Sequence, residues 1–512
     1  MVKMLSLAGF CIGSLAFYAE APAAERQQLQ PDILLIMPDQ MRGDCLSILR
    51  HPAVRTPTFD GLARQGVLFR RAYCTVPSCI PARYALLTGL YPQTSGVVGF
   101  RKKPIDGATM PQVLGNAGYQ TALVGREMHQ AADAAQLGYQ RAVLGSTYVS
   151  DDQYAAVLMQ AVPGVKDVRQ WVESLGLSYN HWQARAWPLS NDLHPTTWVT
   201  TQARRVLSEA PPGQPLFLTA SFYAPHPPLF PPPAYFESYL EKELPAAARG
   251  DWVDWNALTR EGADGGHRVL LEGEPLRKAQ AGYFGLIEHI DHEVAPLIAE
   301  FRARSEAAGR PWVVLLTSDH GEMLGDHGYF RKCEPLEGSA NIPLIICGSP
   351  ELGLHAEQRC SQPVCLEDLL PTLAELAGAK CPEVDGVSLV PVLRGATTAI
   401  RPWLHFEHAP CYSKHQAFHA LTDGCFKYIW RPHDGREHLF DLERDLREEH
   451  DLAPDASQQA LLQQWRARLV ERLAPRPEGF SDGVALIAGR PYPPLQAGVP
   501  RNAAADANDR PQ

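Results

Sequence analysis

The chain has 512 residues, of which 45% are hydrophobic and 20% are charged, so wholesale disorder is excluded. Lysine and arginine number 47 and aspartate and glutamate 57, which gives a formal net charge of −10 and argues against a nucleic-acid binder. A small basic pocket for one anionic group is compatible with this balance.

Residues 1–24 have the pattern of an export signal. Lys3 gives a basic start, Leu5–Ala19 is apolar, and Ala21-Pro22-Ala23-Ala24 offers small residues for cleavage. The apolar run is too short to span a membrane, and a buried N-terminal helix is the alternative. We expect a periplasmic or secreted protein without a membrane span after signal removal. Some of its cysteines can then pair, but the sequence does not give the connectivity.

Apolar runs of strand length alternate with helical patterns along the first 400 residues. Met110–Ala117 and Ala279–Arg302 have helical patterns, and an alternation of this kind predicts an α/β domain with a mostly parallel sheet. Ligands bind beyond the carboxyl ends of the strands in such sheets. The apolar runs are Ile33–Met37, Thr121–Val124, Leu216–Ala220, Trp312–Leu316 and Leu344–Cys347.

We expect the chain to divide into a large α/β domain at 25–400, a small α+β subdomain at 401–475 and a tail at 476–512. Strand-like stretches and a helical pattern at 457–473 predict an antiparallel sheet with one helix in the subdomain. The tail is rich in proline, glycine and alanine, so we expect it to be extended or disordered. Segments 150–200 and 240–275 are interpreted as insertions near the site.

Polar residues follow two of the predicted strands. Asp39 and Gln40 end the first, and Asp319, His320 and Glu322 follow the fourth. Mostly oxygen ligands favour Ca²⁺ or Mg²⁺ over zinc. An aspartate after a strand is about as often a helix N-cap as a ligand.

Cys79 opens a predicted helix, where unpaired N–H groups favour an anion, and Arg83 lies one turn further on. On these residues alone, a structural cysteine is the simpler interpretation. Cys79-Ile80-Pro81-Ala82-Arg83 with Leu87-Thr88-Gly89, however, resembles the formylglycine signature of the type I sulfatases, in the alkaline-phosphatase-like superfamily. The resemblance covers about residues 30–475. Further segments that resemble the family, in its order, are Pro31–Ile36 with Asp39-Gln40, Gly125–His129, Pro225–Pro228, Ser318–Glu322 with Lys332, and Val384–Leu389.

The resemblance implies an alkaline-phosphatase-like α/β fold and a sulfuric ester hydrolase acting on a carbohydrate or aryl sulfate. It implies that a maturation enzyme oxidises Cys79 to formylglycine. One hydroxyl of the hydrated aldehyde then attacks sulfur, and the second expels sulfate. It also implies Ca²⁺, with Mg²⁺ as the alternative, held by the strand-end residues and residue 79. These ligands are Asp39, Gln40, Cys79, Asp319 and His320.

The resemblance assigns roles to the remaining site residues. Arg83 orients the nucleophile, and Arg126 and Lys332 hold the sulfate oxygens. His226 is the general acid that protonates the leaving alcohol, and His129 is the base. Outside such a motif a histidine is more often structural.

Two positions depart from the common pattern of the family. Gln40 stands where many sulfatases have aspartate, and the family branches that also have glutamine there include phosphonate monoester hydrolases and choline sulfatases. Arg126 replaces the usual lysine and keeps the charge, but on a planar guanidinium. A phosphonate monoester or phosphodiester hydrolase is therefore the alternative. A non-enzymatic anion- or glycan-binding protein is a third hypothesis, against which the intact set of site residues argues. His405 and His408 either line the pocket or lie at the surface.

Overall fold

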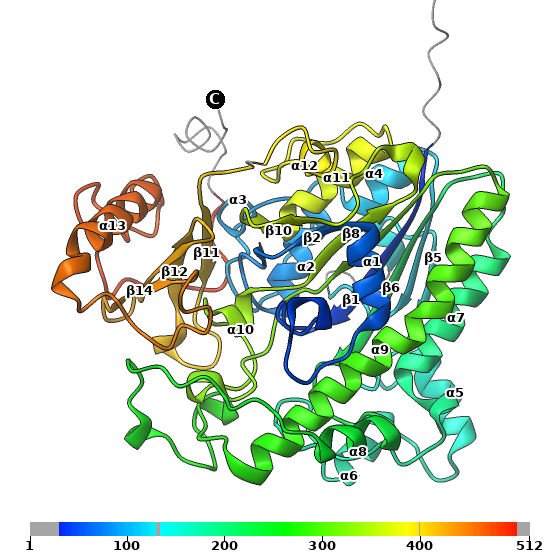
Figure 1. Cartoon of the computed structure of the whole chain (residues 1–512), viewed down its shortest axis with the longest axis horizontal. Helices are drawn as coiled ribbons and strands as arrows, with labels where there is room; N and C mark the ends of the chain where they lie inside the picture. Colours follow the sequence, from blue (N-terminus) through cyan, green and yellow to red (C-terminus); the bar gives the residue numbers. More distant parts are fainter. Residues whose placement is uncertain (1–29, 130–133, 399, 499–512) are drawn as a thin grey trace, which may run out of the picture.

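The computed structural model describes residues 30–129, 134–398 and 400–498, so the proposed signal and the last dozen residues lie outside it. Its centre is an eight-stranded sheet (Figure 1) with the order β5-β4-β6-β1-β7-β8-β2-β9. The strands are β1 (Asp32–Asp39), β2 (Gly66–Phe69), β4 (Gln120–Gly125), β5 (Arg141–Leu144), β6 (Leu216–Pro225), β7 (Trp312–Thr317), β8 (Leu344–Gly348) and β9 (Gln358–Cys360).

The five strands from β5 to β7 are parallel, whereas β8 runs antiparallel to both β7 and β2. The expected mostly parallel α/β sheet is confirmed, and all five apolar runs form strands. An apolar run indicates burial on both faces of a sheet and does not fix the direction of the strand, so the reversed direction of β8 could not be predicted.

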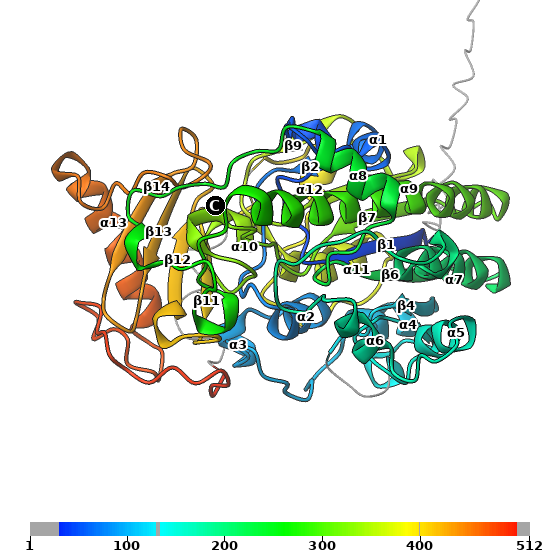
Figure 2. The same ribbon diagram turned by 90° about the horizontal axis from the view of Figure 1, so that it is seen from below.

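Alternate side chains of β1 enter two different cores. Leu34 and Ile36 join the core on one face, and Ile33, Leu35 and Met37 join the other. Figure 2 shows helices on both sides of the sheet. The first core is covered by α1 (Pro57–Gln65), α7 (Pro195–Glu209), α8 (Pro233–Glu241) and α9 (Gly273–Ala307), and the second by α2 (Cys79–Thr88), α4 (Met110–Asn116), α11 (Leu369–Leu376) and α12 (Val390–Leu393).

The C-terminal part of the chain forms a separate antiparallel sheet, β11-β12-β13-β14, with helix α13 packed against it (Figure 1). Phe480 and Tyr492, from the segment after α13, are buried in the same core. The backbone N–H of Glu407 donates to the Thr75 carbonyl at 2.9 Å, so this sheet touches the segment before α2. The elements are β11 (Leu404–His408), β12 (Phe418–Thr422), β13 (Phe426–Trp430), β14 (Glu437–Asp441) and α13 (Gln459–Leu473).

Shorter elements complete the described chain. Residues 150–200 contain α5, α6 and the start of α7, and 240–275 is mostly irregular. Among the described residues, no helix combines the length and apolarity needed to cross a membrane. The ten described cysteines are free thiols. The remaining elements are α3 (Pro92–Ser95), α5 (Gln153–Ala161), α6 (Val168–Ser174), α10 (Glu337–Ala340), β3 (Ala72–Tyr73) and β10 (Val364–Cys365).

Candidate active site

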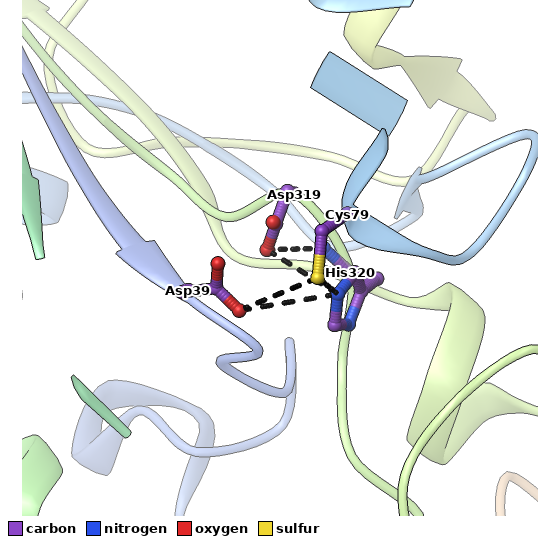
Figure 3. A group of neighbouring side chains, drawn as sticks. All are labelled: Asp39, Cys79, Asp319 and His320. Carbon is purple, nitrogen blue, oxygen red and sulfur yellow. Dashed lines mark hydrogen bonds and ion pairs between the residues drawn. The ribbon is translucent and has the colours of Figure 1, made fainter. Parts of the chain in front are cut away.

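Four of the predicted site residues meet at the carboxyl end of the sheet (Figure 3). Asp39 ends β1, Asp319 and His320 follow the neighbouring parallel strand β7, and Cys79 opens α2. One ligand atom from each lies within 4.8 Å of the others, and all four residues are buried. The sheet thus gathers these side chains because adjacent parallel strands end at the same edge.

The spacing and the donor chemistry of this group fit one divalent cation. Ligands on opposite sides of a Ca²⁺ ion are about 5 Å apart. The His320 Nδ1–H donates to the Gly321 carbonyl at 2.9 Å, so Nε2 is left as a lone-pair donor, 3.1 Å from Cys79 Sγ. A histidine ligand needs such a fixed tautomer.

Arg83 pairs with both carboxylates. Its Nη2 lies 2.8 Å from Asp39 Oδ2 and its Nε 3.0 Å from Asp319 Oδ2, and all three side chains are inaccessible to solvent. Burial raises the pKa of Asp39, but Arg126 and Arg83 outweigh burial and hold the pKa well below its usual range. Arg126 and Arg83 therefore keep Asp39 ionised in the interior.

Gln40 lies beside this group in a left-handed backbone conformation, with φ of 69°. Its N–H donates to Asp319 Oδ1 at 3.0 Å, and its Nε2 donates to Glu322. Its Oε1 accepts from Lys332 Nζ at 2.9 Å. A carbonyl oxygen has a second lone pair, so this contact leaves Oε1 able to bind a cation.

Lys332 also donates to Cys79 Sγ, at 2.9 Å. Burial and Asp39 raise the pKa of Cys79, whereas Lys332 and His320 lower it, and the result lies below the usual value. The surroundings of position 79 therefore stabilise negative charge on its side chain.

Arg126 links two of the predicted residues. Its Nε lies 2.7 Å from Asp39 Oδ2, and its Nη2 donates to His129 Nε2 at 2.7 Å. The guanidinium also lies 4.3 Å from the centre of the Tyr223 ring. Burial and Arg126 lower the pKa of His129 well below its usual value, so His129 is neutral here.

His226 is fixed by two backbone contacts. Its N–H donates to the Asp39 carbonyl at 3.1 Å, and its Nδ1–H donates to the Pro227 carbonyl at 2.7 Å. Burial and then Lys332 lower the pKa of His226 well below its usual value. All the predicted site residues therefore belong to one connected cluster.

Two residues to which the sequence analysis assigned no role support the cluster. Glu322 accepts hydrogen bonds from Gln40 Nε2 and from the N–H groups of Leu324 and Arg331. His408 Nε2 lies 2.7 Å from Ser78 Oγ, next to Cys79, and His408 is fully buried, so its surface placement is wrong. The position of Glu322 in the segment after β7 was the available signal.

The mostly parallel sheet, the metal-type cluster at its strand ends and the cysteine that opens the adjacent helix are the arrangement that the resemblance to the alkaline-phosphatase-like superfamily implied. The sulfatase family model matches residues 31–379, and a model of the N-sulphoglucosamine sulphohydrolase C-terminal region matches 325–474. The chain therefore belongs to the sulfatase family. It is an enzyme that hydrolyses sulfate esters, as the resemblance predicted.

Relatives and solved structures agree with this assignment. An arylsulfatase of Clostridium perfringens (strain 13 / Type A) is 32% identical over 488 residues, covering 91% of this chain and 99% of that protein. A choline-sulfatase of Rhizobium meliloti (strain 1021) is 28% identical, covering 83% and 82%. The phosphonate monoester hydrolase of Agrobacterium radiobacter is 25% identical with a TM-score of 0.70, covering 87% of this chain and 96% of that structure.

Proposed function

We propose that this sulfatase acts through formylglycine at position 79 and a divalent cation, Ca²⁺ rather than Mg²⁺. The contacts of Cys79 Sγ carry the proposal, because it lies 3.1 Å from His320 Nε2 and 2.9 Å from Lys332 Nζ. This sulfur stands in for the reacting oxygen of the matured residue. The proposed cation ligands are Asp39, Gln40, Asp319, His320 and residue 79.

The bound cation supplies positive charge that stabilises oxygen anions at residue 79 and on the ester. The chain supplies further charge from Lys332, which donates to Sγ and to Gln40 Oε1 rather than to a carboxylate. Its charge is therefore available to a sulfate oxygen. Arg126 contacts Asp39 and is proposed to contact the substrate as well. Arg126 and Arg83 keep the Asp39 carboxylate ionised, and Arg83 orients residue 79.

His226 is the proposed general acid. Its Nδ1–H is held by the Pro227 carbonyl, so Nε2 is the atom that carries the transferable proton. Lys332 lowers the pKa of His226, and a bound sulfate opposes this effect. Protonation of His226 is thus coupled to substrate binding. His129, kept neutral by burial and Arg126, is the proposed base.

The substrate class is a carbohydrate or aryl sulfate, which the arylsulfatase relative supports. Gln40 and the likeness to a phosphonate monoester hydrolase favour the alternative, a phosphonate monoester or phosphodiester hydrolase. Rates on an aryl sulfate and an aryl phosphonate ester with the same leaving group separate the two. We expect the larger kcat/KM for the sulfate, and a dominant phosphonate rate would overturn this choice.

We further propose a maturation enzyme as partner and export guided by residues 1–24. Fragmentation of the tryptic peptide 72–83 from active protein tests the nucleophile, with formylglycine expected at position 79. Cys79→Ala is expected to abolish sulfate release while circular dichroism stays unchanged. An intact thiol in active protein, or turnover by the alanine variant, would refute the mechanism.

A further inference from the structure

Two segments far apart in the sequence pack together beside the active site. The first, 331–333, contains Lys332, and the second, 411–416, connects β11 to β12 of the C-terminal sheet. The Arg331 guanidinium lies 4.3 Å from the centre of the Tyr412 ring. Gln416 Nε2 donates to the Lys332 carbonyl at 3.1 Å. These contacts set the two segments side by side.

Cys333 and Cys411 meet across this junction. Each thiol lies close enough to the other to shift its pKa. Cys333 is fully buried, and its N–H donates to the Pro77 carbonyl at 2.9 Å, two residues before Cys79. Cys411 is only half-buried. Cys411 is therefore the more exposed residue of the pair, and Cys333 is held against the segment that leads into α2.

We propose that Cys333 and Cys411 form a disulfide in the mature protein, which links the active-site segment covalently to the C-terminal sheet. The oxidant is a disulfide, either glutathione disulfide or an oxidoreductase disulfide. The Cys411 thiolate attacks one sulfur of the oxidant and releases the other as a thiolate. Cys333 then loses its proton and attacks the Cys411 sulfur, releasing the second thiol. Two protein thiols and one disulfide thus give one protein disulfide and two thiols.

Two observations support this order of attack. Cys411 is the more exposed of the two cysteines. The Cys333 thiol, and then Lys332 and Arg331, lower the pKa of Cys411, whereas burial raises the pKa of Cys333 well above its usual value. The thiolate is the reactive form, so Cys411 is the first nucleophile.

The proposed disulfide would help to hold Lys332 in place. Residue 333 is held on one side by the Pro77 carbonyl and, in the oxidised protein, on the other by Cys411. The disulfide would therefore limit movement of the Lys332 backbone relative to Cys79. This proposal does not depend on the state of residue 79.

The test uses the full-length enzyme equilibrated with glutathione disulfide, alkylated, digested with trypsin and analysed without reduction. Cys333 falls in peptide 333–359 and Cys411 in peptide 395–414. We expect the two peptides joined and lighter by two hydrogen atoms than the reduced pair. Alkylation of both cysteines in this sample would overturn the proposal, as would a link from either one to residue 79.

Cys347 also lies in peptide 333–359, so Cys347→Ser is the matched control. We expect the joined peptide to persist in this variant and to disappear in Cys411→Ser. Dithiothreitol should lower the thermal midpoint of the parent protein and leave that of Cys411→Ser unchanged. Equal effects of the reductant on both proteins would contradict a disulfide at this position.

Discussion

Lys332 Nζ lies 2.9 Å from Cys79 Sγ, although 253 positions separate the two residues in the sequence. Lys332 follows β7 and Cys79 opens α2, so the contact forms only when the strand end and the helix are both in place. The buried ammonium is thereby fixed against the sulfur that stands in for the proposed reacting oxygen, before any substrate binds.

Replacement of Lys332 by methionine is expected to lower kcat about 10²–10³-fold, because the variant loses one positive donor to the developing charge. Lys332→Arg should retain part of the activity, since it keeps the positive charge but spreads it over a planar guanidinium in place of a compact ammonium. Steady-state rates on an aryl sulfate check both. Unchanged kcat in Lys332→Met would remove Lys332 from the catalytic step.

Glu322 is expected to control metal affinity through Gln40. Glu322→Gln places an amide donor opposite Gln40 Nε2, so Gln40 has to turn its oxygen away from Lys332. We expect the Ca²⁺ dissociation constant to rise about 10–100-fold. Calorimetric titration of the chelator-treated protein measures it, with the exposed Glu351→Gln as control. Equal affinities in the two variants would show that Gln40 is not a ligand held by Glu322.

His408 makes stability depend on pH. Burial lowers its pKa to about 4, and its Nδ1–H donates to the Ala409 carbonyl. The folded state then binds fewer protons than the unfolded state, so this contribution is present above pH ~6.5 and is lost as the pH falls towards the folded pKa. It amounts to about 3 kcal/mol of unfolding free energy, at 1.36 kcal/mol per pKa unit.

Urea midpoints measured between pH ~4 and ~6.5 test this expectation, because linkage predicts a slope there. His408→Gln should flatten the slope, whereas His450→Gln, at a histidine with 74% side-chain exposure, should leave it unchanged. Parallel slopes in all three proteins would place the pH dependence elsewhere.

The segment after α13 is expected to stabilise the C-terminal sheet. Arg476 Nη1 donates to Glu407 Oε1 at 2.8 Å, and Tyr492 donates to the same carboxylate. Arg476→Met leaves a buried carboxylate without its cation and should cost about 3–5 kcal/mol of unfolding free energy. Chemical unfolding checks this against Arg490→Met, at an exposed position. Similar losses in both variants would contradict a specific role for the Arg476 pair.

The sequence indicated most of the metal-type cluster. Asp39 and Asp319 follow adjacent buried strands, and the carboxyl ends of parallel strands meet at one edge. Contacts such as Ser78 with His408 depend on how the C-terminal sheet docks against α2, which no local pattern encodes. Helix α9 begins at Gly273, before the predicted helix, because its first turns are polar and carry little apolar periodicity.

Cys79 is only 2% exposed, and two residues that contact its sulfur, His320 and Lys332, come much later in the chain. During synthesis, residue 79 leaves the ribosome while these covering segments have not yet been made. An enzyme that oxidises Cys79, as we propose, would therefore have to act on the growing or unfolded chain, before the segment after β7 folds against the thiol.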